Sequence, residues 1–182
     1  IRTNYQKNKV KFLASFYPIY IMALNIVDGV EGIEVDCMAE VQVGCLHDFK
    51  LSTDNMRDIE KSDGFIINGA GMEGFIEDIA NRVDGLHIID SSIGINLLAD
   101  GHHHDEDEHD HEHEDEHNHD HGEYNAHLWV SVANYIKQVE NITEGIVKID
   151  PAHEKEYRRN SKEYIAKLTK LQNEMESGLS NI

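Results

Sequence analysis

The sequence is poor in proline, cysteine and basic residues. Its 182 residues include two prolines, two cysteines and one tryptophan, and only 16 Lys and Arg accompany 35 Asp and Glu. The two cysteines, Cys37 and Cys45, are too few for a disulfide framework. The formal net charge of -19 would repel nucleic acid, which excludes the nucleic-acid-binding classes.

Long hydrophobic runs are also missing. No stretch approaches the roughly 18 to 20 consecutive apolar residues that a membrane-spanning helix needs. The apolar content of 40% is nevertheless sufficient for one hydrophobic core in a chain of this length. We therefore expect one domain with an appended segment.

The sequence alternates between strand and helix patterns. Apolar runs and alternating residues predict strands at residues 10–16, 33–37, 65–67 and 87–90. Capping residues and helical periodicity predict helices at 18–28, 53–61, 72–82 and 131–146, and a long helix from Pro151 to about Gly178. We expect an α/β fold with a mostly parallel four-stranded sheet flanked by helices, followed by a long carboxyl-terminal helix. Ligands of such folds bind in loops beyond the carboxyl ends of the strands.

Residues 101–122 form an acidic, histidine-rich tract, which contains nine of the 13 histidines and ten of the 35 acidic residues. Its histidines are His102, His103, His104, His109, His111, His113, His117, His119 and His121. Imidazoles bind transition metals, and the interleaved carboxylates attract divalent cations. Without apolar side chains the tract cannot pack a core, so we expect a mobile, solvated loop that chelates metal.

Two further histidines fall in predicted loops of the sheet. His47 follows the second strand within Gly44-Cys-Leu-His-Asp48, and His127 follows the tract within Asn125-Ala-His-Leu-Trp129. Position alone leaves a surface or capping role open for each of them. The neighbouring chelating tract favours a metal-ligand role for these two histidines, because metal gathered by the tract needs a second site that binds it.

Four segments together resemble a known family. They are Ser15-Phe-Tyr-Pro18, Leu46-His-Asp-Phe49, Asn68-Gly-Ala-Gly-Met-Glu73 and Asn125-Ala-His-Leu-Trp-Val-Ser131. In this order they resemble the amino-terminal lobe of zinc and manganese ABC-transporter solute-binding proteins, most closely the zinc-specific branch with a histidine-rich loop. The resemblance implies that His47 and His127 are the metal ligands of the main site and that the tract is an accessory site.

The resemblance also implies a domain organisation. Residues 1–149 correspond to the amino-terminal metal-binding lobe, and residues 150–182 to the helix that links two lobes. The carboxyl-terminal lobe, with the family's remaining histidine and acidic ligands, is expected to be absent from this chain. Leu46 and Ala126 replace the prolines that usually precede the two ligands.

Zinc in proteins takes four ligands, so two imidazoles leave the site incomplete. The candidates for completing it are tract histidines, water, an acid such as Asp48, a second molecule, or the missing lobe. Cys45 is another conceivable ligand, although a small packed residue is the simpler interpretation. Histidine and carboxylate ligands favour Zn²⁺ here but also admit Mn²⁺, Cu²⁺ or Ni²⁺.

The predicted function is that of an extracytoplasmic solute-binding protein in a high-affinity zinc ABC uptake system. It would capture Zn²⁺ and deliver it to the membrane subunits of the permease, from the periplasm or from a lipid anchor at the bacterial cell surface, without catalysis. One alternative is a histidine-rich metal-storage or chaperone protein. Another is a nucleotide-binding enzyme, because Gly69-Ala-Gly-Met-Glu-Gly74 matches G-x-G-x-x-G and Asp90 could bind a ribose. Glu73 would oppose the phosphates of such a ligand.

Overall fold

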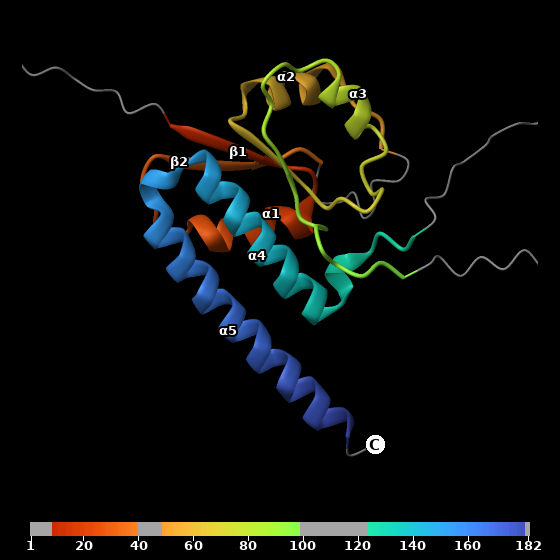
Figure 1. Cartoon of the computed structure of the whole chain (residues 1–182), viewed down its shortest axis with the longest axis vertical. Helices are drawn as coiled ribbons and strands as arrows, with labels where there is room; N and C mark the ends of the chain where they lie inside the picture. The colour runs from red at the N-terminus through yellow and green to blue at the C-terminus, as the bar shows by residue number, and fades with distance from the viewer. Residues whose placement is uncertain (1–8, 40–48, 99–123, 181–182) are drawn as a thin grey trace, which may run out of the picture.

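The protein is built on a parallel sheet of four strands (Figure 1). A computed structural model describes residues 9–39, 49–98 and 124–180. The strands are β1 (Val10–Ala14), β2 (Ile33–Cys37), β3 (Gly64–Ile67) and β4 (Ile88–Asp90), in the spatial order β2-β1-β3-β4. All three strand pairs are parallel, which confirms the predicted α/β class and sheet.

Helices cover both faces of this sheet. One face packs against α1 (Tyr17–Val27) and α4 (Val132–Ile149), on which α5 (Glu154–Leu179) lies, and the other face packs against α2 (Thr53–Lys61) and α3 (Ile76–Ala80) (Figure 1). Successive strand residues alternate between the two layers, because side chains of a strand point to opposite faces. Phe12 and Ala14 join the core under α1 and α4, whereas Leu13 joins the core under α2 and α3.

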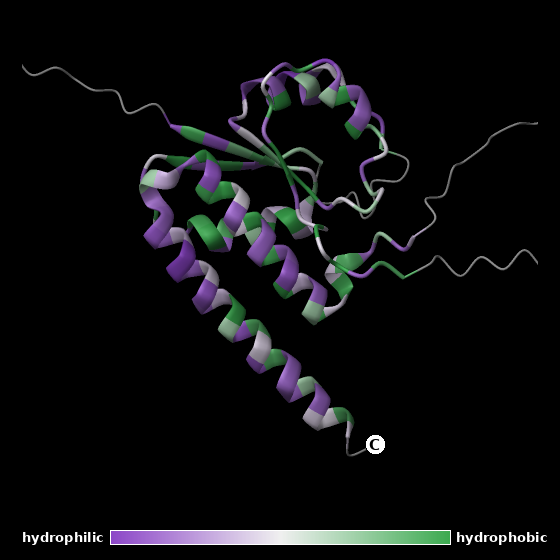
Figure 2. Cartoon of the chain, viewed as in Figure 1, coloured by the Kyte–Doolittle hydropathy of each residue, from purple (hydrophilic) through white to green (hydrophobic). Residues whose placement is uncertain are grey.

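The strands are buried because both faces of the sheet are covered. Every residue of β3 is buried, as its continuous apolar sequence predicts for a parallel strand between two helical layers. In Figure 2 the hydrophobic colour gathers in the strands and on the helix sides that face them. The resulting core fixes the strand ends, from which the loops of the candidate site emerge.

Two predicted helix starts are confirmed by their capping bonds. The Ser52 hydroxyl accepts a hydrogen bond from the Asn55 backbone N–H at 3.1 Å, and Ser131 caps α4 through the N–H of Asn134. The long last helix begins differently from the prediction. Residues 151–153 form a 3-10 turn, and the Asp150 side chain accepts hydrogen bonds from the side chains of His153 and Tyr157.

The predicted helix at residues 72–82 is shorter in the structure, where α3 spans Ile76–Ala80. Gly69, Ala70 and Gly71 precede it with left-handed φ angles of 77°, 53° and 81°. A Cβ atom on Gly69 would lie 2.0 Å from Asp90 Oδ1, so only glycine fits there. The chain therefore makes a tight loop before the helix can begin.

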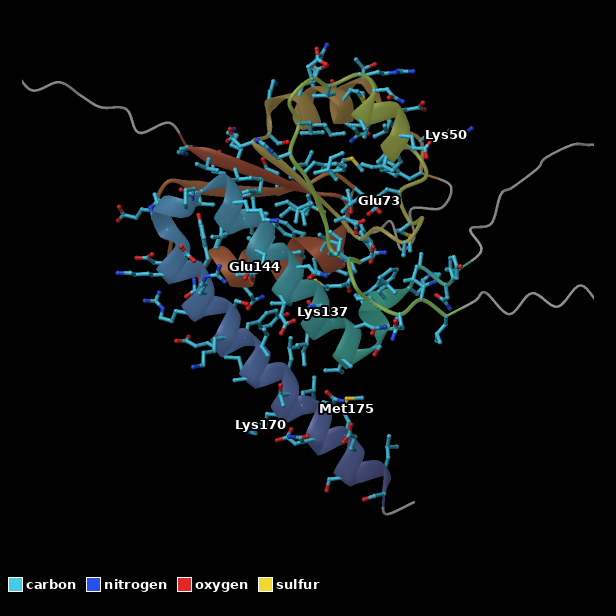
Figure 3. All side chains as sticks on the ribbon, in the orientation of Figure 1. Lys50, Glu73, Lys137, Glu144, Lys170 and Met175 are labelled. Atoms are coloured by element: carbon cyan, nitrogen blue, oxygen red, sulfur yellow. The ribbon has the colours of Figure 1, made fainter. Side chains whose placement is uncertain are left out.

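Helix α5 extends beyond the rest of the protein (Figure 1). Its first half packs on α1 and α4, where Tyr157, Asn160 and Ser161 are buried. In its second half Leu171 and Met175 are 47% and 50% exposed, although they continue the same apolar stripe. Figure 3 shows Met175 on this part of the helix. Among the described residues, no helix is both long and apolar enough to cross a membrane.

Candidate metal centre

Buried polar side chains gather at the carboxyl edge of the sheet, where the parallel strands end. Ser15 follows β1, Asn68 follows β3 and Ser91 follows β4, and all three are fully buried. The Asn68 amide donates a hydrogen bond to the carbonyl of Ala126 at 2.9 Å. The loop that contains His127 therefore lies at this edge, as predicted from the usual ligand position of α/β folds.

His127 is exposed and its ring is held in one orientation. Its backbone N–H donates to Asn125 Oδ1 at 2.9 Å, and its Nδ1 lies 3.0 Å from the same oxygen. Because this oxygen can only accept, Nδ1 carries the proton and Nε2 carries the lone pair, which is the form of the imidazole that a metal site requires. Such orientation of a ligating imidazole by a neighbouring oxygen is typical of metal sites.

An aromatic stack supports the His127 ring. The ring centroid lies 5.1 Å from that of Trp129, and the Trp129 ring packs edge-on against buried Phe16 at 4.9 Å. Phe16 follows β1 and precedes α1, so the stack connects the His127 loop to the core. The rigid core thus restricts the position of the exposed imidazole.

His47 lies within residues 40–48, outside the described residues, so its distance to His127 stays a prediction. The two flanks of that segment are described. The Ala39 N–H donates to the Ser15 carbonyl at 3.2 Å, and the Phe49 ring lies 6.0 Å from that of Phe75.

The nine tract histidines, His102 to His121, also lie outside the described residues. The chain on either side of the tract is joined at one point, because the Asn125 N–H donates to the Leu98 carbonyl at 2.9 Å. Asn125 is the residue that orients His127. The described residues on the two sides of the tract therefore meet beside the His127 loop.

No group of three or more metal-ligating side chains occurs among the described residues. His87 lines a groove of about 260 Å³ between β4 and α4, together with Asp90, Glu144 and Lys148. This groove contains a single histidine. His87 itself lies just before β4, at the amino edge of the sheet and away from His127.

The first backbone amides of the glycine-rich loop bond to a carboxylate of the protein itself. The buried Glu73 carboxylate accepts hydrogen bonds from the Asn68 N–H at 2.8 Å, the Gly69 N–H at 3.0 Å and the Ser15 hydroxyl at 2.7 Å. Burial raises the pKa of Glu73, and these three hydrogen bonds oppose that rise. Figure 3 shows Glu73 inside the molecule, near the strand ends. A buried negative charge beside these amides would oppose a nucleotide phosphate.

Sequence reasoning missed two residues of this edge, Asn68 as a hydrogen-bond donor and Gln138 as its buried partner. Gln138 Nε2 donates to Asn68 Oδ1 at 3.0 Å and to Ser91 Oγ at 2.9 Å. One signal was available, since Gln138 lies three residues after Tyr135 and four before Ile142 on the apolar stripe of α4. A polar residue at such a position is buried and needs hydrogen-bond partners.

Comparison with known proteins finds relatives along nearly the whole chain. The zinc-binding protein AdcA of Streptococcus pyogenes is 30% identical over 182 residues, with 96% of this chain and 35% of AdcA covered. The high-affinity zinc uptake system protein ZnuA of Bacillus subtilis is 33% identical over 166 residues, with 90% of this chain and 50% of ZnuA covered. The chain thus spans half or less of the length of these relatives.

Solved structures share the fold. The metal-dependent lipoprotein YcdH from Bacillus subtilis matches with a TM-score of 0.73 and 29% identity over 91% of this chain and 54% of YcdH. Zn(II)-bound AdcA from Streptococcus pneumoniae matches with a TM-score of 0.76 at 22% identity, over 94% of this chain and 33% of AdcA. The family profile described as zinc-uptake complex component A, periplasmic, matches residues 13–182. The chain therefore belongs to the family of periplasmic zinc-uptake components, ZnuA.

Proposed function

We propose that this chain is the first metal-binding lobe of an extracytoplasmic receptor for high-affinity zinc uptake. In this proposal His47 and His127 bind one Zn²⁺ as neutral imidazoles at the carboxyl edge of the sheet. The observation with most weight is the exposed His127 ring, whose Nδ1 is fixed by Asn125 so that Nε2 remains a ligand. Family membership and the zinc-named relatives AdcA and ZnuA support the same metal.

The remaining ligands come from outside this pair, because zinc prefers four. We propose that a second lobe supplies them, with α5 as the connection. The exposed apolar residues in the second half of α5 support this arrangement, since they continue a stripe that packs on the lobe in the first half. Mn²⁺, Cu²⁺ and Ni²⁺ remain chemically compatible cargo for such ligands.

The tract of nine histidines acts in this proposal as an accessory site that raises the local metal concentration. The hydrogen bond between Leu98 and Asn125, which brings the described flanks of the tract together beside His127, supports this role. Delivery is proposed to the membrane subunits of an ABC permease. The periplasmic family and the lipoprotein YcdH among the structural matches support an extracytoplasmic location.

The test is zinc calorimetry on a chain that lacks residues 102–121. We expect one zinc per chain to remain bound, and His47→Ala or His127→Ala to weaken its binding by about 100-fold, equivalent to about 2.7 kcal/mol. His87→Ala is the matched control, because His87 is an exposed histidine at the opposite edge of the sheet. It should leave the affinity within about twofold of the parent chain.

The storage hypothesis predicts a different result in the same experiment. A buffer whose principal site is the tract would lose nearly all zinc binding on removal of residues 102–121, and neither loop variant would matter. A receptor should also bind zinc more weakly below about pH 6, because each imidazole must lose its proton before it coordinates. Calorimetry between pH 5 and pH 8 measures this slope.

A further inference from the structure

We propose that Asn68 is a positioning residue for His127, and that it sets the affinity of the metal site through the backbone. The proposal rests on the proposed role of His127 as a ligand. Asn68 is fully buried and does not reach the ligand itself. Its carboxamide instead fixes the peptide group directly before His127.

The orientation of the Asn68 carboxamide is fully determined by its partners. Its Nδ2 donates to the carbonyl of Gly69 at 2.9 Å and to the carbonyl of Ala126 at 2.9 Å. Its Oδ1 accepts from Gln138 Nε2 at 3.0 Å. A flipped amide would place its oxygen against two carbonyls, so the side chain has a single favourable orientation.

Gln138 fixes Asn68 from the side of α4. Its Nε2 has two acceptors, Asn68 Oδ1 and Ser91 Oγ, and the Ser91 hydroxyl in turn donates to the Asn68 carbonyl at 3.0 Å. The Gln138 Oε1 atom has no hydrogen-bond partner among the described residues. The two hydrogen bonds from Nε2 therefore determine the orientation of the Gln138 amide, although its buried Oε1 acceptor stays unpaired.

The peptide group between Ala126 and His127 is held on both of its polar atoms. Its carbonyl oxygen accepts from Asn68 Nδ2 and from the Leu128 N–H at 2.8 Å. Its N–H donates to Asn125 Oδ1, the same atom that orients the imidazole. Rotation of this peptide would therefore move the imidazole away from the direction in which its Nε2 now points.

This connection matters because metal affinity depends on preformed ligand geometry. Loss of a group that orients a ligand typically weakens metal binding by about 10- to 100-fold. Asn68 acts one step further away, through the peptide, so the lower end of this range is expected. The buried network thus couples the end of β3 and helix α4 to a solvent-exposed imidazole.

The experiment uses the full chain labelled with ¹⁵N, and follows the backbone N–H and ring nitrogens of His127 by NMR. In metal-free Asn68→Ala, the His127 N–H should exchange with solvent faster than in the wild type, because the peptide is no longer anchored. During titration with buffered free Zn²⁺, the His127 transition should shift to about tenfold higher zinc concentration. Because both the exchange rate and the zinc titration are read from signals assigned to His127, zinc bound by the tract histidines does not contribute to either value.

The matched control is Asn160→Ala. Asn160 is also a buried asparagine whose Nδ2 donates to two carbonyls, those of Ile26 and Asp28, at 3.0 Å and 2.8 Å. Asn160 belongs to α5 and binds the carboxyl-terminal end of α1, away from His127. Its replacement should lower the melting temperature of the chain. The exchange rate of the His127 N–H and the zinc midpoint of His127 should stay within about twofold of the wild type. If Asn68→Ala unfolds the chain, Gln138→Leu replaces it and should shift both readouts in the same direction.

Two results would overturn the proposal. One is a folded Asn68→Ala chain with wild-type exchange and zinc midpoint at His127, and the other is an equal shift of both in Asn160→Ala. Failure of the proposed function gives a different pattern, because zinc would then leave the His127 ring signals of the wild type unchanged. The exchange rate of the metal-free variants still decides whether Asn68 positions the loop.

Discussion

The two edges of the sheet both contain buried polar groups, and they use them differently. At the carboxyl edge Glu73, Asn68 and Gln138 connect loops to one another and leave one imidazole exposed. At the amino edge Asp150 accepts hydrogen bonds from Tyr157 and His153, both at 2.6 Å, and joins α4 to α5. The amino edge fixes a helix direction, whereas the carboxyl edge fixes the position of a reactive side chain.

This difference indicates where substitutions affect function and where they affect only stability. Hydrogen bonds at the amino edge are made between secondary structure elements that already pack together. Those at the carboxyl edge stabilise loops with left-handed backbone at Gly69, Ala70 and Gly71, which apolar packing alone would not specify. Substitutions at the carboxyl edge should therefore lower the free energy of unfolding more than comparable substitutions at the amino edge.

The largest effect is expected from Gly69→Ala. The new Cβ atom combines a left-handed backbone penalty with a clash against Asp90 and should lower the free energy of unfolding by about 3 kcal/mol. Gly29→Ala is the control at the amino edge, because Gly29 has a φ of 70° and open space around its Cα atom. It should cost only about 1 kcal/mol in urea unfolding. Equal losses in the two variants would remove the proposed difference between the edges.

A smaller effect is expected from Glu73→Gln. The amide keeps the shape of the side chain but directs a donor at one of the fixed donors of Asn68, Gly69 or Ser15. An unsatisfied buried donor should lower the free energy of unfolding by about 2 kcal/mol. Glu144→Gln is the exposed counterpart, since it removes an ion pair with Arg158 and should cost less than about 1 kcal/mol. A Glu73→Gln chain as stable as the wild type would refute the structural role of this carboxylate.

The smallest effect is expected from Tyr157→Phe at the amino edge, about 1.5 kcal/mol at pH 7 for a lost hydrogen bond to a charged acceptor. The pH dependence sharpens this test. Burial raises the pKa of Asp150, but hydrogen bonds from Tyr157 and His153 outweigh it and lower the pKa below its ordinary value. The stability from the ionised carboxylate is therefore complete above about pH 4 and is lost as the pH falls through the lowered pKa.

The corresponding measurement is urea unfolding of wild type and Tyr157→Phe from pH 7 to pH 3. The difference between the two curves should shrink at the acidic end, because protonated Asp150 is a weaker acceptor. A difference that stays constant over this range would mean that the tyrosine hydroxyl does not depend on the charge of Asp150.

Much of the fold could be predicted from local sequence. The continuous apolar run at Phe65–Ile67 predicted a doubly covered strand, and Ser131 predicted the start of α4 through its capping bond. The shortened α3 could not be predicted in this way. Its late start depends on the Glu73 carboxylate bonding to backbone amides four and five residues earlier, and on the space left by Asp90 beside Gly69.

The candidate site was predictable in part. His127 was identified from its motif, and the structure places it at the predicted edge of the sheet. The role of Asn68 was not accessible, because a hydrogen bond between residues 58 positions apart depends on the folded sheet. The burial of His153 was not predictable either, because the i,i+3 spacing alone does not require its ring to be four-fifths buried against Asp150.

The most direct test of zinc ligation is a crystal structure of the zinc-loaded full chain, with the metal located by anomalous scattering. We predict one zinc ion about 2.0–2.1 Å from both His127 Nε2 and a ring nitrogen of His47. Zinc bound only by histidines of residues 101–122, with His127 Nε2 outside the coordination sphere, would contradict the proposed site.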